Sequence, residues 1–279
     1  MKRCVFCDKS APVVSFSKEH VLRAKLAKVV IGSPNKEMWV SKSINLENEI
    51  ILRDILLPQS PFDKTINSIC ETCNNGWLNQ KVEIASEKYI EALILDHHID
   101  LDFISKNRIA LWASKTAAVR GLQDPKPRGM PDSHYFWIKT QLTPPPYTYV
   151  WLFKTLYNAN TMTRHIRHLI TDPETQITTP SHLSVINIGH MGLIILGCGL
   201  KIGEEYFSDY INKIDEMKSI KLWPSNCEPV FFENLSQIDP NVLYELTDEI
   251  IQEKHMSTRE MRFKAKKKYN MRSTLHPIK

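Results

Sequence analysis

Four cysteines arranged in two pairs are the residues of this chain with the clearest chemical meaning. Each pair has two residues between its cysteines, and the pairs lie far apart in the sequence, at Cys4–Cys7 and Cys70–Cys73. Two such pairs supply four thiolates, the ligand set of a tetrahedral structural zinc site. Zinc suits soft sulfur ligands and brings no redox chemistry. We therefore expect a structural Zn²⁺ that joins two distant segments; the alternative is two unrelated pairs that are redox-active or packed in the core.

A second group of candidate residues lies beside these pairs. Glu19 and His20 stand between them, and Asn74 follows the last cysteine directly. A neutral histidine can deprotonate a water molecule for attack on a phosphodiester. Carboxylate and amide oxygens are hard ligands that suit Mg²⁺ or Mn²⁺, and such an ion stabilises the charge of the transition state. This favours metal-dependent hydrolysis, with His20 as general base and Glu19 and Asn74 as ligands of the catalytic ion. Four thiolates leave zinc no open position, so the zinc is expected to be a scaffold.

The complete pattern runs Cys-x-x-Cys, then Glu-His-Val, then Cys-x-x-Cys-Asn-Asn-Gly-Trp-Leu, and it resembles the HNH endonucleases with a ββα-metal active site. It is most similar to the subgroup in which a Cys4 zinc supports that site, and the resemblance covers roughly residues 1–95. It implies the same roles: Glu19 binds the catalytic ion, His20 is the general base, and Asn74 is the other ligand. The family more commonly has aspartate at the first of these positions and often histidine at the last, although asparagine also occurs there.

The family also has a middle asparagine, which orients the catalytic histidine. Thr65 stands at the commonest spacing for that residue, and Asn67 is the nearest candidate for the role. Asn75 is the substitute ligand if Asn74 points away from the ion.

The sequence around these residues predicts the elements that position them. Pro12–Phe16 is expected to form a short strand pair leading to Glu19–His20, and Thr65–Ile69 a strand that enters the second cysteine pair. From Trp77 to Ile94, apolar residues recur at three- and four-residue spacing, which predicts a long helix. We therefore expect residues 1–98 to form a zinc-stapled, treble-clef-like ββα-metal nuclease module.

The remainder of the chain has a different character, and we expect it to form a second α+β unit at residues 104–254. Its first element is predicted to be an amphipathic helix at Ile104–Leu122. Stretches rich in β-branched and aromatic residues then predict at least four antiparallel strands. These stretches are Tyr147–Tyr157, Arg164–Thr171 and His182–Leu200, and further helices are predicted at Glu204–Met217 and Pro240–Glu253. The fold class expected for the whole chain is thus α+β.

Basic residues suggest where nucleic acid would bind. The chain has 279 residues and a formal net charge of +5, and residues 255–279 form a basic tail with eight lysines and arginines against one acidic residue. Such a tail can bind phosphates, or simply keep the chain soluble. The candidate nucleic-acid-binding residues are Lys81, Lys266, Lys267 and Lys268. The predicted 104–122 helix could extend this surface, or have a merely solvated face, with Lys106, Arg108, Lys115 and Arg120.

Together these patterns favour a prokaryote-type, cytoplasmic endonuclease that cuts double-stranded DNA with Mg²⁺ or Mn²⁺. No long apolar segment predicts a membrane span, and the cysteines suggest no disulfide framework. One alternative is a non-catalytic, zinc-containing nucleic-acid-binding protein. Another is the nuclease effector of a defence or toxin system, controlled by a regulatory protein or ligand at residues 104–254.

Overall fold

The computed structural model describes residues 2–30, 41–44, 50–53, 61–124, 126, 128–171 and 175–247. Helices and antiparallel sheets alternate along the chain, so the predicted α+β class is confirmed. Met1–Pro240 forms one compact unit and Asn241–Lys279 a second. The predicted boundary near residues 98–104 falls within the first unit, between two helices that pack on each other. Within the described residues, no helix is long and apolar enough to cross a membrane.

The bounds of the elements are as follows. The strands are β1 Phe16–His20, β2 Ser41–Ile44, β3 Ile50–Arg53, β4 Thr65–Cys70, β5 Asp100–Leu101, β6 Thr148–Thr171, β7 Thr178–Cys198, β8 Ile220–Trp223 and β9 Val230–Phe231. The helices are α1 Glu71–Cys73, α2 Ile84–Ile94, α3 Phe103–Gly121, α4 Asp132–Gln141, α5 Lys201–Tyr206 and α6 Ser208–Asp215. The π-helical segment η3 spans Asn74–Glu83, and 3₁₀ turns are η1 Ala24–Lys28, η2 Pro61–Asp63 and η4 Phe232–Asn234.

The N-terminal hairpin is built from strands that are distant in sequence. β1 pairs antiparallel with β4, and His20 lies opposite Thr65 in this pairing. The strand pair expected around Pro12–Phe16 is therefore wrong: residues 11–14 form turns, and β1 begins only at Phe16. Pro12 has no N–H to donate to a strand, which disfavours a ladder at this point.

The helix predicted after the second cysteine pair is confirmed. α1, η3 and α2 follow β4 from Glu71 to Ile94, with a kink at Gly76. The first part has wider π-helical geometry, and Gly76 has non-helical dihedral angles within it. The buried residues of the helix recur at helical spacing and include Leu78, Val82, Ile90 and Leu93.

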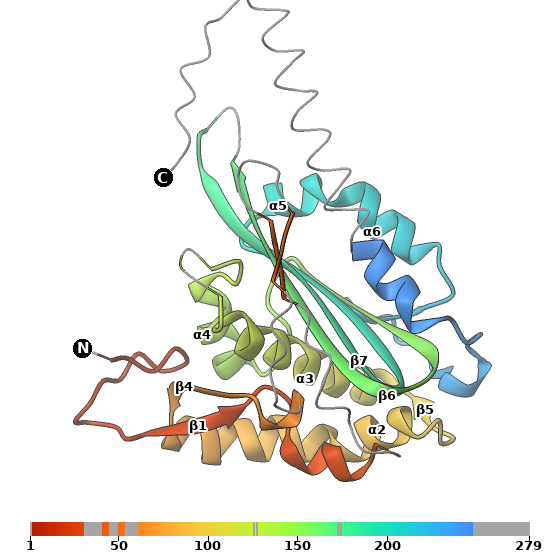
Figure 1. Ribbon diagram of the computed structural model, residues 1–279, viewed down its shortest axis with the longest axis horizontal. Coiled ribbons are helices and arrows are strands. Elements are labelled where there is room, and N and C mark those ends of the chain that lie inside the picture. The colour runs from red at the N-terminus through yellow and green to blue at the C-terminus, as the bar shows by residue number, and fades with distance from the viewer. Residues whose placement is uncertain are drawn as a thin grey trace, which may run out of the picture. The chain divides into compact units, whose positions relative to one another are not determined.

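Helix α3 has a central position in the first unit. It contacts η3 and α2 on one side and β6, β7 and β8 on the other, and Figure 1 shows it between these layers. Nearly every residue from Ser105 to Val119 is buried, so the predicted amphipathic character is wrong. Of the four basic residues suggested for a DNA-facing or solvated face of this helix, Lys106 and Lys115 are fully buried, whereas Arg108 is exposed and Arg120 half-buried. Partners in the interior, described below, compensate for the burial of these charges.

The main sheet contains fewer and longer strands than the sequence predicts. It has three strands in the order β7-β6-β8, all antiparallel. The prediction of at least four strands between residues 147 and 200 is wrong, because β6 and β7 run through the polar positions that the sequence suggests as breaks. At Asn158 and Gly189 the pairing shifts register without ending, as in a β-bulge.

Two predicted segments lie partly or wholly outside the described residues. Of the helix expected at Pro240–Glu253, residues 240–247 are described and are helical. The basic tail at 255–279, with Lys266, Lys267 and Lys268, lies outside the described residues.

We predict that Gly189→Ala destabilises the protein by more than about 1 kcal/mol, because alanine is strained at a positive φ. Gly189 has φ of +56°, and a Cβ atom there would lie 2.5 Å from the carbonyl oxygen of Ile94 in α2. Urea unfolding of the full chain measures the effect. As a control, Val13→Ala at a 75% exposed position should change the free energy of unfolding by less than about 0.5 kcal/mol. Equal stability of the two variants would contradict the prediction.

Candidate functional site

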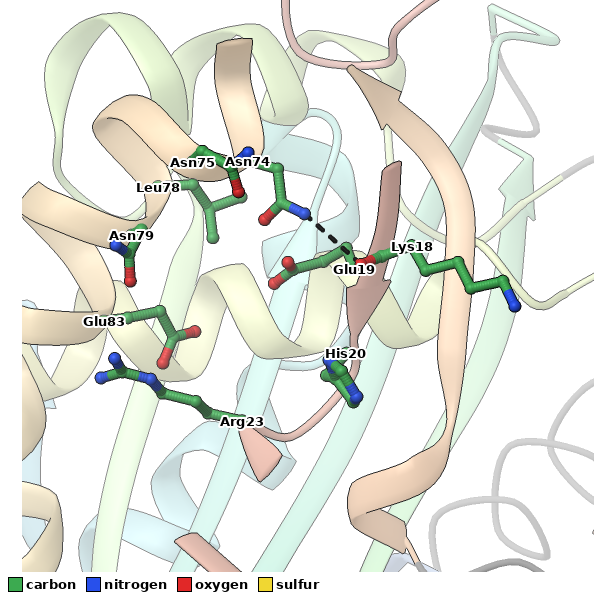
Figure 2. A pocket seen from close by; sticks show the side chains of 9 residues that line it. All are labelled: Lys18, Glu19, His20, Arg23, Asn74, Asn75, Leu78, Asn79 and Glu83. Atoms are coloured by element: carbon green, nitrogen blue, oxygen red, sulfur yellow. Dashed lines mark hydrogen bonds between the residues drawn. The ribbon is translucent and has the colours of Figure 1, made fainter. Parts of the chain in front are cut away.

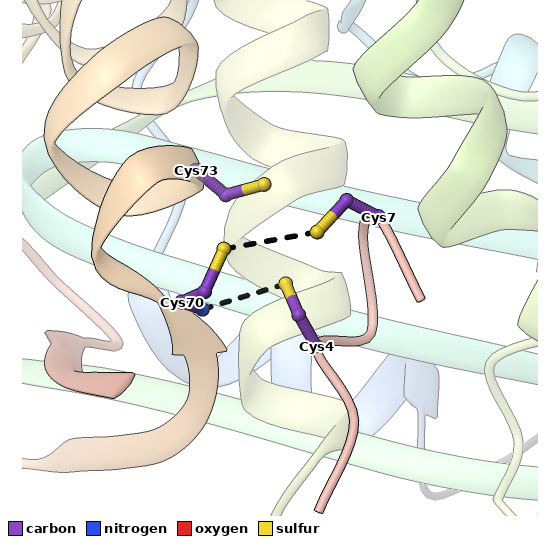
Figure 3. Close-up of side chains that lie close together, drawn as sticks. All are labelled: Cys4, Cys7, Cys70 and Cys73. Atoms are coloured by element: carbon purple, nitrogen blue, oxygen red, sulfur yellow. Dashed lines mark hydrogen bonds between the residues drawn. The ribbon is translucent and has the colours of Figure 1, made fainter. Parts of the chain in front are cut away.

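The four predicted metal-binding cysteines converge in space. The sulfur atoms of Cys4, Cys7, Cys70 and Cys73 all lie within 4.8 Å of one another. Figure 3 shows two of them on the N-terminal turn and two at the junction of β4 and α1. The Sγ atoms of Cys7 and Cys70 are 3.7 Å apart. Four sulfurs around zinc, each at about 2.3 Å, would be separated by about 3.8 Å, so this cluster could hold a zinc ion.

The turn that carries the first pair is fixed by its backbone. The Cys4 N–H donates to the Lys9 carbonyl at 2.9 Å, and Asp8, with φ of +56°, donates back to the Cys4 carbonyl at 2.8 Å. Between the cysteines, Phe6 is fully buried and packs edge-on against Trp77 and Tyr135. The turn is thereby held against both η3 and α4.

The thiols of the cluster differ in their acidity. A hydrogen bond from Cys73 lowers the pKa of Cys4 to about 4, whereas the same contact raises the pKa of Cys73. Burial raises the pKa of Cys70. One thiolate, at Cys4, is thus favoured before any ion binds. Binding of a cation by all four sulfurs has to release the remaining protons, so its affinity falls as the pH falls.

Three of the four predicted catalytic residues, Glu19, His20 and Asn74, meet in one pocket next to this cluster. The pocket has a volume of about 300 Å³. Glu19 and His20 line it from β1, and Asn74 lines it from the start of η3 (Figure 2). The other lining residues are Lys18, Arg23, Asn75, Leu78, Asn79 and Glu83. Residues that are more than fifty positions apart in the sequence are therefore neighbours. This is expected if a zinc ion joins the two segments that carry the cysteine pairs.

The amide of Asn74 is oriented by β1. Its Nδ2 donates to the Ser17 hydroxyl at 2.9 Å and faces the Lys18 carbonyl at 3.5 Å. This assignment of nitrogen follows from the hydrogen-bond partners. The Oδ1 atom is then on the side of the Glu19 carboxylate, as Figure 2 shows. Asn74 is buried and Asn75 is exposed, so Asn74 is the better candidate for a metal ligand.

The Glu19 carboxylate is held from inside the protein. Its Oε1 accepts a hydrogen bond from the Lys115 ammonium at 2.9 Å, and Lys115 also forms an ion pair with Glu83. Trp112 donates its indole N–H to the other oxygen of Glu83 at 3.2 Å. Burial alone would lower the pKa of Lys115, but the attraction of Glu83 and Glu19 outweighs it and raises the pKa above its ordinary value. Lys115 is therefore a buried cation between two carboxylates.

His20 lines the pocket, but Asn67, the residue predicted to orient it, does not. His20 is half-buried on the wall of the pocket, and no described residue hydrogen-bonds its imidazole. Asn67 is exposed on β4 and does not line the pocket. It lies where the pairing of β1 and β4 shifts, between the partners of Ser17 and Glu19. Its orienting role stays a prediction. Thr65, directly opposite His20, is the closer residue along the ladder.

A basic residue on the pocket wall is anchored to α2. Arg23 forms an ion pair with Glu87, and Lys25 shares the same carboxylate. The hydrogen bond from Lys25 lowers the pKa of Glu87. These contacts fix Arg23 at the rim of the pocket beside Glu83, as Figure 2 shows. Lys81, the predicted phosphate contact, is exposed on η3 and does not line the pocket.

The sequence predicted no role at the site for Glu83, which lines the pocket, or for Trp112 and Lys115, which lie behind it. Glu83 was within the predicted helix and Lys115 within the next one, with no motif to connect them. One feature of the sequence could have indicated the role of Lys115. This lysine stands three residues after Trp112 in a run of small and apolar residues, and a cation that is buried among such residues needs an acidic partner.

Comparison with known proteins identified no relative of this chain. A scan against protein-family models, a search of curated proteins and a search of solved structures each gave no match.

We predict that replacing Cys73 with serine removes bound zinc and destabilises the hairpin–helix junction, because three thiolates hold zinc less tightly than four. Metal analysis of the purified full chain should give about one zinc per molecule before the change and markedly less after it. Cys227→Ser is the control, since Cys227 is exposed and outside the cluster. Wild-type protein purified without zinc, after growth in zinc-replete medium, would contradict the expectation.

Proposed function

We propose that this chain is a metal-dependent endonuclease of the HNH type, with Zn²⁺ as a structural ion and Mg²⁺ or Mn²⁺ at the active site. One observation carries the proposal: Glu19, His20 and Asn74 line a single pocket beside a four-cysteine cluster. The antiparallel pair β1–β4, followed directly by a helix, has the ββα order that the resemblance implies.

The donor set of the pocket suits a small divalent cation. The Glu19 carboxylate and the Asn74 amide oxygen are hard ligands that come from two elements, β1 and η3. Bound there, the ion supplies positive charge to the phosphate and to the leaving oxygen. Because the site has few protein ligands, water molecules would complete the coordination, as is usual for Mg²⁺.

In this proposal His20 takes a proton from the attacking water. It is half-buried and next to Glu19 in sequence, so it has access to both solvent and the pocket. Arg23, on the pocket rim, is placed to bind a substrate phosphate, with its fork of N–H donors.

The proposed substrate is DNA, most simply double-stranded. The net positive charge of the chain and its basic tail favour a polyanion. Lys81 lies on the same helical segment as Asn74 and would contact the backbone next to the cut. Control by a partner or ligand remains a prediction. The close packing of α3 under the pocket supports a physical connection between the two halves of the chain.

We predict that His20→Ala lowers the rate of cutting by at least about 100-fold, because loss of a general base typically costs that much. The measurement is nicking of supercoiled plasmid by the full chain with Mg²⁺ or Mn²⁺. His97→Ala is the matched control, since His97 is exposed and outside the pocket. Both variants should fold, because neither side chain is fully buried.

Two results would contradict the proposal in different ways. Undiminished cutting by the His20→Ala protein would show that His20 is not the base. Salt-sensitive DNA binding by the wild type, without cutting under any metal, would favour the non-catalytic binding protein.

A further inference from the structure

We propose that Lys115 is a positioning residue for Glu19, and that α3 thereby forms the buried side of the candidate active site. The inference rests on the proposed function, in which Glu19 binds the catalytic ion. It assigns a role to a residue that lies outside the resemblance, which covers roughly residues 1–95.

The geometry places Lys115 behind the ligand, away from the pocket opening. The Lys115 side chain is 1% exposed, whereas that of Glu19 is 11% exposed. Lys115 bonds only one carboxylate oxygen of Glu19, the Oε1 atom. No described residue hydrogen-bonds Oε2, so this oxygen remains available to an ion. A carboxylate held at one oxygen and open at the other is pre-organised for single-oxygen coordination.

The ammonium itself is fixed by a second carboxylate. Glu83 forms an ion pair with Lys115 through Oε1, and the Trp112 indole holds its Oε2. The chain of contacts runs from Trp112 through Glu83 and Lys115 to Glu19. Since both oxygens of Glu83 have protein partners, its part in this arrangement is to hold Lys115.

The charges of the network also suit a divalent ion. Two carboxylates and one ammonium leave one net negative charge beside the pocket. Without Lys115, two neighbouring buried carboxylates would repel each other, and Glu19 would lose its fixed orientation. Lys115 therefore keeps Glu19 in place. Its positive charge slightly reduces the attraction of the two carboxylates for a metal cation.

The same helix contains a natural comparison. Lys106 is also fully buried in α3, but its Nζ bonds neutral oxygens, Asn226 Oδ1 at 2.8 Å and the Glu228 carbonyl at 2.6 Å. It does not line the pocket or contact Glu19. Replacing either lysine with methionine removes a buried ammonium from α3. Only the change at Lys115 should affect the site.

The test measures binding of Mn²⁺ by electron paramagnetic resonance, with zinc-loaded full chain and no DNA, and then plasmid cutting over a range of Mn²⁺ concentrations. In Lys115→Met the dissociation constant for Mn²⁺ should rise by about 10- to 100-fold, the usual effect of losing a residue that orients a metal ligand. Cutting should fall most at low Mn²⁺ and recover in part at high Mn²⁺. Lys106→Met should lose stability but keep the wild-type affinity for Mn²⁺.

A double variant covers the case in which Lys115→Met does not fold. Lys115→Met with Glu83→Gln removes both charges behind Glu19 and leaves no second buried carboxylate. It should fold and still bind Mn²⁺ more weakly than wild type. Wild-type affinity in either folded variant would overturn the inference while the nuclease proposal stands. A wild-type protein that neither binds Mn²⁺ nor cuts DNA would overturn the proposed function, and the inference with it.

Discussion

The convergence of four cysteine sulfurs is the constraint on which the rest of the candidate site depends. It joins the N-terminal turn to the end of β4, since Cys7 and Cys70 are 63 positions apart in the sequence. The helix begins directly at the second pair, so the same constraint determines where Asn74 lies. The pairing of β1 with β4 then brings Glu19 and His20 to the same place. A metal ion would make this arrangement rigid without taking part in the chemistry.

The pocket has a second layer, formed by α3, which lies outside the part of the chain that the resemblance covers. α3 packs between the hairpin–helix layer and the main sheet, and Trp112 and Lys115 project from it toward the carboxylates of the pocket. A buried charge of this kind is costly unless it is fully paired, and here it has two partners. The candidate site is therefore a product of the whole first unit.

Local patterns predicted the site better than they predicted the fold around it. The cysteine spacing and the Glu19–His20 dipeptide identified residues that do meet in one pocket, since short-range chemistry is visible in sequence. The same reasoning misjudged α3, because a central helix with two paired lysines resembles an amphipathic one. It also divided β6 at residues 158–163, where the structure accommodates the polar residues in bulges. Partners such as Glu83 and Lys115, distant in sequence, depend on tertiary packing.

Two separate metal ions are central to the proposed function: a structural zinc at the cysteines and a divalent ion between Glu19 and Asn74. Anomalous diffraction from crystals soaked in Mn²⁺, recorded at the zinc and manganese absorption edges, tests it most directly. The account predicts a zinc peak among the four sulfurs and a distinct manganese peak at the Glu19 carboxylate and the Asn74 amide oxygen. Manganese that binds elsewhere, with none at these two residues, would contradict it.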